Sequence, residues 1–205
     1  MSSIGTVVAS GPRWATVTRS TKETQITVTL KLDGTGETNI ETGVGFFDHL
    51  LNSMAHHALF DLDVEAAGDL VIDEHHTVED VALVIGAALA QALGDRSGIS
   101  RFGDAAIPMD ESVATCVVDV GGRPYAVVDL PFKGKRAGKM PLELIEHVLE
   151  SFARAGGVTL NIKGKGRNDH HLAEAAFKAF GRAMRAACAV DARRSGPAST
   201  KGTLG

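Results

Sequence analysis

The chain has 205 residues, of which 44% are hydrophobic and 22% charged, a composition typical of a soluble globular protein with a buried core. Its formal net charge of −4 gives no overall attraction to nucleic acid or to anionic membranes, so we expect neither as a partner. The beginning of the chain lacks the features of a secretory signal, and the longest apolar stretch, residues 81–93, is too short to span a bilayer. Cys116 and Cys188 lack a CxxC spacing and are expected to be reduced packing residues of a cytoplasmic protein.

Residues 1–12 are expected to form a flexible N-terminal segment, followed by a first half-repeat over residues 13–100. In this half, the alternating and β-branched runs 15–20 and 24–32 predict a hairpin, and the "DGTG" that follows is typical of a turn. The remaining elements are predicted in the order helix, strand, strand or loop, and long helix, over residues 47–57, 60–66, 67–74 and 75–93.

A second half-repeat over residues 101–205 is predicted to contain the same kinds of element in the same order. These are two strands, a helix, a strand and a long helix, over residues 112–120, 125–130, 141–155, 157–163 and 170–188. This order indicates an α+β fold in which helices pack on one face of each of two similar βαβ-type sheets, and the two halves form one catalytic unit. Both long helices are apolar around most of their circumference, which we interpret as packing between subunits of an oligomer.

The two halves also resemble each other in sequence. "DHLLNSMA" over residues 48–55 matches "EHVLESFA" over 146–153, and "HHTVEDVALVIGAAL" from residue 75 aligns with "HHLAEAAFKAFGRAM" from residue 170. A third match pairs "RSG" at 96–98 with "RSG" at 194–196. Three matches in the same order indicate the duplication of a half-domain.

Six of the eight histidines occupy equivalent positions in the two halves: His49, His75, His76, His147, His170 and His171. A single pair of adjacent histidines is usually a surface feature, but two copies of HHxxE, each with a further histidine upstream, indicate metal ligands. Residues at i and i+4 share one face of a helix, and mixed imidazole and carboxylate ligands suit Mn, Fe, Co or Zn.

Together with two glutamates, these histidines make eight ligands, enough for two ions with four protein ligands each. The symmetry favours one group of His75, Glu79, His147 and His171. It favours a second group of His49, His76, His170 and Glu174. The residues alone leave open whether both halves of a site come from one subunit.

Basic residues near hydroxyl groups give a weaker signal for an oxyanion site. Arg101, Arg123 and the "STKG" over 199–202 offer donors that phosphate prefers. The basic, Gly-rich stretches 133–139 and 163–167 are more simply interpreted as solvated loops. Neither GxxxxGK[ST] nor GxGxxG is present in the sequence, so no nucleotide-binding loop is predicted.

These motifs resemble those of the imidazoleglycerol-phosphate dehydratase family of histidine biosynthesis. The resemblance covers nearly the whole chain and is carried by "TKET", "TGVGFFDHLL", both HHxxE segments, "FGDAAIPMDES", "GGRPY" and "PASTKG". It implies two Mn(II) ions per active site, with other first-row metals possible, and a homo-oligomer of 24 subunits that share their sites. It also implies a monofunctional lyase, because the chain is too short for the phosphatase domain fused to some bacterial members.

The resemblance assigns roles to particular residues. The metal ligands fall on His49, His75, His76, Glu79, His147, His170, His171 and Glu174. The phosphate-binding positions fall on His57, Arg101, Arg123, Lys178, Ser199 and Lys201. Glu23 matches the acid that takes part in proton transfer, with metal-bound Glu79 or Glu174 as the second choice. Ser53 stands where the family commonly has Gln, and Gly45 stands where it has Pro, which is expected to loosen the loop leading to His49.

The implied reaction is the dehydration of imidazole glycerol phosphate to imidazole acetol phosphate. A proton and hydroxide leave adjacent side-chain carbons, through an imidazolate and a diazafulvene-like intermediate at a two-metal site. Two other functions are compatible with the residues. A dinuclear metallohydrolase would need no separate phosphate site, and a metal-buffering shell would not need Glu23, Arg101 or Lys201.

Overall fold

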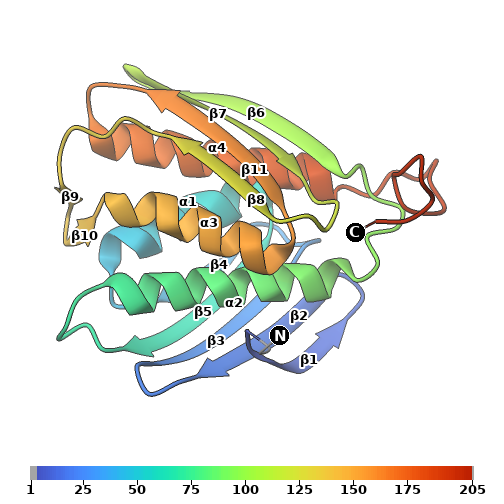
Figure 1. Cartoon of the computed structure of the whole chain (residues 1–205), viewed down its shortest axis with the longest axis horizontal. Coiled ribbons are helices and arrows are strands. Elements are labelled where there is room, and N and C mark those ends of the chain that lie inside the picture. The colour runs from blue at the N-terminus through green and yellow to red at the C-terminus, as the bar shows by residue number, and fades with distance from the viewer. Residues whose placement is uncertain (1–3, 205) are drawn as a thin grey trace.

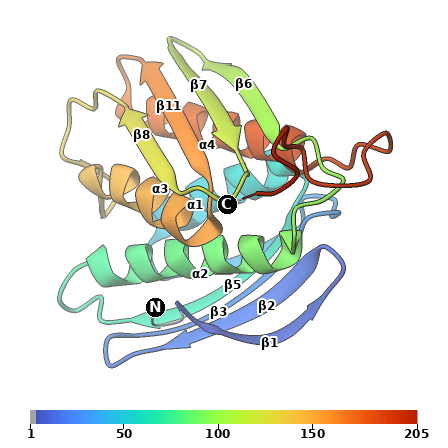
Figure 2. The same cartoon turned by 45° about the vertical axis from the view of Figure 1, so that its right-hand side comes forward.

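Four helices lie between two β-sheets in the computed structural model, which describes residues 4–204 (Figures 1 and 2). The helices are α1 (Gly45–Ala58), α2 (His75–Leu93), α3 (Glu143–Gly156) and α4 (Asp169–Cys188). The first sheet contains, in spatial order, β1 (Thr6–Gly11), β2 (Trp14–Ser20), β3 (Thr24–Lys31), β5 (Asp61–Gly68) and β4 (Thr38–Glu41). The second contains β6 (Phe102–Met109), β7 (Ser112–Asp119), β11 (Thr159–Lys165) and β8 (Tyr125–Asp129). A separate short ribbon is formed by β9 (Arg136–Ala137) and β10 (Met140–Pro141).

The strand order shows the duplication directly. Without β1, the first sheet has the order β2-β3-β5-β4, and the second has the order β6-β7-β11-β8. In each sheet the third strand of this series runs antiparallel to the second and parallel to the fourth. The prediction of an α+β fold with helices on one face of each sheet is confirmed, and the change from one half to the other falls between α2 and β6.

Strand β1 corrects the prediction of a flexible segment over residues 1–12. Residues 6–11 pair antiparallel with β2 and add one strand to the duplicated set, while residues 1–3 lie outside the described residues. The sequence patterns also miss β4, β6 and the β9–β10 ribbon. β6 contains Gly103 and Pro108, which weaken its strand pattern but are tolerated at the edge of a sheet. Of the uncertain region 67–74, the first two residues complete β5 and the rest is a loop.

The long helices cross their partners from the other half at equivalent glycines. α2 packs on the first sheet and on α3, and α4 packs on the second sheet and on α1. A methyl group at Gly86 would lie 2.6 Å from the carbonyl oxygen of Phe152 in α3, and one at Gly181 would overlap the carbonyl oxygen of Met54 in α1. Only a residue without a side chain lets the helix backbones approach so closely.

This packing corrects the interpretation of the two apolar helices as evidence for an oligomer. Both are covered on opposite sides by a sheet and by another helix of the same chain, so their composition needs no partner subunit. By length and composition α2 could cross a membrane, but 72% of its apolar window is buried within the protein. This burial identifies α2 as a helix of the protein core.

Gly181→Ala should destabilise the fold, because the added methyl group would force α1 and α4 apart at their crossing. Overpacking of this kind lowers the free energy of unfolding by about 1–3 kcal/mol, which thermal or urea unfolding would measure. Gly45→Ala is the matched control, since Gly45 begins α1 and a methyl group there meets nothing within 4 Å. Equal stability of Gly181→Ala and wild type would contradict the close crossing.

Candidate metal centre and phosphate site

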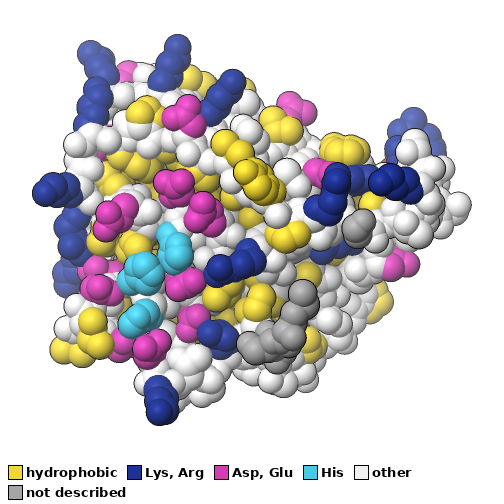
Figure 3. Space-filling view, viewed as in Figure 1, with side chains coloured by type: hydrophobic (Ala, Val, Ile, Leu, Met, Phe, Trp, Pro, Cys, Tyr) yellow, Lys and Arg dark blue, Asp and Glu magenta, His cyan; other side chains and the backbone are white. Residues whose placement is uncertain are grey.

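Both long helices carry a double histidine in their first turn, where a polar side chain that precedes the helix accepts free backbone N–H groups. Asp73 Oδ1 accepts from the His75 N–H at 2.9 Å, and Asn168 Oδ1 accepts from the His170 N–H at 3.0 Å. Histidine side chains gather among acidic ones over the first turns of α2 and α3 (Figure 3). The fold therefore collects the predicted metal ligands at the N-terminal ends of helices.

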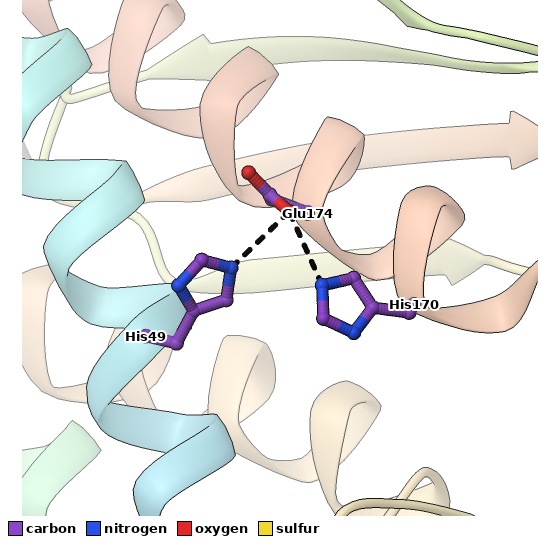
Figure 4. Close-up of side chains that lie close together, drawn as sticks. All are labelled: His49, His170 and Glu174. Atoms are coloured by element: carbon purple, nitrogen blue, oxygen red, sulfur yellow. Dashed lines mark ion pairs between the residues drawn. The ribbon is translucent and has the colours of Figure 1, made fainter.

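The first cluster, here called the α1/α4 trio, consists of His49, His170 and Glu174 (Figure 4). The Nε2 atoms of His49 and His170 lie 3.1 and 3.3 Å from the same oxygen, Glu174 Oε2. The start of α1 is held by Asp48, whose Oδ1 accepts from the N–H of Thr42 at 3.2 Å and from its hydroxyl. These two contacts anchor the start of α1 one residue before His49.

The second cluster, the α2/α3 trio, consists of His75, Glu79 and His147. The Nε2 atoms of His75 and His147 lie 3.9 and 3.4 Å from Glu79 Oε2. His147 Nε2 is buried and has no hydrogen-bond partner among the described residues. A first-row metal ion would satisfy this buried nitrogen. The two imidazoles and the carboxylate of the trio are ligands that fit such an ion.

The two trios are related by the duplication, and each takes its ligands from both halves. His49 of the first half joins His170 and Glu174 of the second, whereas His147 of the second half joins the pair His75 and Glu79 of the first. The pairing of α1 with α4 and of α2 with α3 produces both clusters.

Both glutamates are ionised at neutral pH. Burial raises the pKa of Glu174, but hydrogen bonds from Lys178 and His49 and their positive charges outweigh it and leave the pKa at about 2. Burial also raises the pKa of Glu79, and the His147 ring and the Arg154 guanidinium bring it below its usual value. Each trio therefore offers a negative oxygen ligand at physiological pH.

The second histidine of each pair points away from its neighbour's trio, as expected for adjacent residues on a helix. His76 Nδ1 lies 2.9 Å from Asp69 Oδ2, and His171 Nδ1 lies 3.0 Å from Glu111 Oε2. Within one chain, the four-ligand groups predicted from the sequence are therefore brought together only in part. Three of four ligands meet at each cluster, and His76 and His171 lie elsewhere.

Four of the six predicted phosphate-binding residues line one hollow of about 340 Å³: Arg101, Arg123, Ser199 and Lys201. The two "RSG" segments hold this region together. Ser97 and Pro197 form an antiparallel bridge, and the Gly98 N–H donates to the Gly196 carbonyl at 3.2 Å. The duplicated motif thus places the C-terminal segment beside Arg101.

Arg101 is fixed in the wall of this hollow. Its Nε and Nη2 donate to the Asp119 carboxylate at 2.7 and 2.9 Å, and its Nη1 donates to the Ala198 carbonyl at 2.7 Å. The hydrogen bond to Asp119 raises the pKa of Arg101 further above its usual value, so the guanidinium stays charged. Because Asp119 balances this charge, the excess positive charge that suits an oxyanion comes from Arg123 and Lys201 in the same hollow.

The other two predicted phosphate-binding residues, His57 and Lys178, do not line the hollow. They continue the α1/α4 trio along its two helices, and Lys178 Nζ lies 2.7 Å from Glu174 Oε1. Burial and the charge of Lys178 lower the pKa of His57, so this ring is neutral at physiological pH. Ser53 lies half-buried on the same face of α1, midway between His49 and His57.

Glu23 lies in the turn between β2 and β3, with its side chain 55% exposed and 3.9 Å from His76 Nδ1. The next residue, Thr24, is buried, and its hydroxyl donates to Asp80 at 2.6 Å, which anchors the turn. The carboxylate of Glu23 is therefore accessible but held on a fixed backbone.

Three carboxylates that contact the predicted site residues were missed in the sequence: Asp69, Glu111 and Asp119. The repeat offers a signal for Glu111, because the "ES" that begins β7 corresponds to the "ET" of Glu23 and Thr24 that begins β3. Asp69 and Asp119 have no comparable signal, since single acidic residues near strand ends are common.

Comparison with known proteins identifies the family. Residues 42–184 match the family model described as imidazoleglycerol-phosphate dehydratase. The chain is 53% identical over 192 residues to the imidazoleglycerol-phosphate dehydratase of Methanoculleus marisnigri, covering 94% of this chain and 100% of that protein. It is 51% identical over 206 residues to that of Chloroflexus aurantiacus, covering 100% of both.

Solved structures agree with this assignment. The imidazoleglycerol-phosphate dehydratase of Staphylococcus aureus has a TM-score of 0.78 and 34% identity, over 86% of this chain and 99% of that one. The enzyme of Pyrococcus furiosus has a TM-score of 0.79 and 34% identity, over 91% of this chain and 99% of that one. The chain therefore belongs to the imidazoleglycerol-phosphate dehydratase family, a family of hydro-lyases.

Proposed function

We propose that this chain is a metal-dependent dehydratase that converts imidazole glycerol phosphate to imidazole acetol phosphate and water in histidine biosynthesis. The observation that carries the proposal is the pair of symmetric trios, each with two imidazole nitrogens and one ionised carboxylate. Such ligand sets suit first-row divalent ions, and we propose two Mn(II) ions per active site. The two free, buried thiols, Cys116 and Cys188, are compatible with a cytoplasmic enzyme.

We infer that neighbouring copies complete the metal sites. Each trio offers three ligands, while His76 and His171 stand outside both trios and are 37% and 25% exposed. A partner's His171 would serve the α2/α3 trio, and a partner's His76 would serve the α1/α4 trio. Metal ions shared in this way would tie copies together, in support of the 24-subunit shell that the family resemblance implies.

The residues of the chain then divide the reaction between them. When bound, the two ions would withdraw negative charge from the imidazole ring of the substrate. The C–O bond on the carbon beside the ring would break to give a diazafulvene-like intermediate, and Glu23 would remove the proton from the next carbon to form the enol. The same carboxyl would return its proton to the leaving hydroxide, so that water departs and the remaining enol becomes the ketone. The hollow that contains Arg101 and Lys201 would hold the phosphate.

One assay tests this function: the purified, manganese-loaded protein is incubated with imidazole glycerol phosphate, and formation of the ketone is followed. We expect ketone formation that stops on chelation and returns with Mn(II). Release of inorganic phosphate without ketone would indicate a metallohydrolase instead. Manganese binding without any turnover would indicate a metal-buffering protein.

Lys201→Ala should weaken substrate binding and leave the manganese content unchanged, because Lys201 lines the hollow and belongs to neither trio. Loss of a charge-assisted hydrogen bond of about 1.5–3 kcal/mol corresponds to a KM increase of about 10- to 150-fold. Lys165→Ala, which removes the same charge from an exposed position on β11, is the control. An unchanged KM for Lys201→Ala would remove this residue from the phosphate site.

Manganese affinity should fall as the pH decreases from about 8 to about 6. Hydrogen bonds that the rings donate to the Asp69 and Glu111 carboxylates raise the pKa of His76 and of His171 above the usual value of about 6.5, so protons compete with metal already above that pH. The pKa of Glu174 is about 2 and that of Glu79 is also lowered, so neither carboxylate titrates in this range. Competitive Mn(II) titrations at several pH values would check this, and a constant affinity would contradict it.

A further inference from the structure

The duplication places one carboxylate at the same turn in each half, but the two carboxylates have different surroundings. Glu23 stands between β2 and β3, and Glu111 stands between β6 and β7, strands that occupy equivalent places in the two sheets. The residues that follow, Thr24 and Ser112, are both 2% exposed. The turns are therefore counterparts, and the difference lies in what each carboxylate binds.

Glu111 is fully engaged. Its Oε1 accepts from the Ser112 hydroxyl at 2.8 Å and from the backbone N–H groups of Arg167 and Asn168 at 3.1 and 2.8 Å. Its Oε2 lies 3.0 Å from His171 Nδ1. Four contacts fix the carboxylate against the start of α4, with one oxygen reserved for the imidazole.

In the first half, the equivalent contact to the second histidine of the pair is made by Asp69. Its Oδ2 lies 2.9 Å from His76 Nδ1, whereas Glu23 is 3.9 Å from the same atom. Asp69 Oδ1 is buried without a hydrogen-bond partner among the described residues, so the side chain's one hydrogen bond there is to His76. Glu23 is thereby left free to reach a substrate.

An ionised carboxylate can only accept a hydrogen bond, so the imidazole nitrogen that faces it must carry the proton. We propose that Glu111 and Asp69 are positioning residues that hold His171 and His76 as Nδ1–H tautomers and so present the Nε2 lone pair of each ring to a metal ion. Carboxylate partners of this kind orient metal-binding histidines, and their loss commonly weakens metal binding about 10- to 100-fold. This inference rests on the proposed metal-dependent function.

Glu111→Gln tests the role of the carboxylate at His171 with little change in shape. Oxygen Oε1 of the new amide can keep the three donors that Ser112, Arg167 and Asn168 provide. The NH₂ group must then face His171 Nδ1 and act as a donor, which forces the ring proton onto Nε2 and blocks the metal-binding lone pair. Asp69→Ala tests the same role at His76 and removes no other hydrogen bond seen in the described residues.

The measurement is competitive titration of each protein with Mn(II) alone, with EPR detection of the free ion, together with thermal unfolding. Each variant should bind one ion of the wild-type pair about 10- to 100-fold more weakly, and its metal-free unfolding temperature should stay near that of wild type. Asp110→Asn is the control, because Asp110 is 3.8 Å from His171 Nδ1 but its side chain is 79% exposed.

Wild-type affinity in both Glu111→Gln and Asp69→Ala would overturn the inference while leaving the metal-dependent function intact. If Glu111→Gln does not fold, Asp69→Ala decides by the same criterion. A wild-type protein that binds no Mn(II) would overturn both this inference and the proposed function.

Discussion

Glu23→Gln should lower kcat by a factor on the order of 100 or more, with KM and manganese content near those of wild type. The amide matches the carboxylate in size but cannot take a proton from the substrate carbon. Glu23 belongs to neither trio, and its carboxylate is 3.9 Å from His76, whose Nδ1 hydrogen bond goes to Asp69. Its loss should therefore affect proton transfer and not the metal.

Lys22→Gln is the matched control for this variant, because it places the same new residue at an exposed position of the same turn. Its turnover should equal that of wild type. If Glu23→Gln retains full turnover with normal metal content, proton transfer must be assigned to another group. Glu79 and Glu174 are the next to test, and any change there must be separated from the loss of a metal ligand.

His171→Ala and His147→Ala should each abolish activity alone but restore part of it when both variants are present in one assembly. In our proposal, His171 of one copy completes the α2/α3 trio of another. A site that combines the intact trio of a His171→Ala chain with the intact His171 of a His147→Ala chain has all its ligands. Random mixing of equal amounts should produce such sites at about one quarter of all positions.

The test is co-expression of the two variants with different affinity tags, followed by tandem purification and measurement of turnover and bound manganese. The control mixture is His75→Ala with His147→Ala. Both changes lie in the same trio of one chain, so no combination of chains restores a complete site. Recovery in the control, or no recovery in the first mixture, would contradict completion of the site between copies.

Much of the fold was predictable because the same order of hydrophobic patterns occurs in both halves of the sequence. Residues 75–93 and 170–188 have apolar surfaces and clear ends, and the helix predicted over 75–93 matches α2. The hairpin of β2 and β3 follows from alternation that the structure buries on one side, as with Ile26, Val28 and Leu30. Other strands have a pattern too weak to be predicted, because they form through pairing with their neighbours in the sheet. Examples are β4, which has only four residues, and β6, which contains a glycine and a proline.

The metal ligands could be recognised from the sequence because i, i+4 spacing is a local property of a helix. Their grouping could not be settled in this way. His49 meets Glu174 because α1 packs on α4, which depends on the close crossing at Gly181. The directions of His76 and His171 depend on Asp69 and Glu111, which are seven and 60 residues away in the chain.

Because each trio draws on both halves, a half-length ancestor ending near residue 100 would have owned no complete trio. In such a half-chain, His49 would have had no Glu174 to meet, and His75 would have had no His147. Two such half-chains, packed as α1 packs on α4 and α2 on α3, would form two identical clusters about a two-fold axis. A symmetric homodimer must give the glutamates at both counterpart turns the same surroundings. Fusion of the two copies into one gene removed that constraint, and only then could position 111 become a clamp for a histidine while position 23 was left free for chemistry.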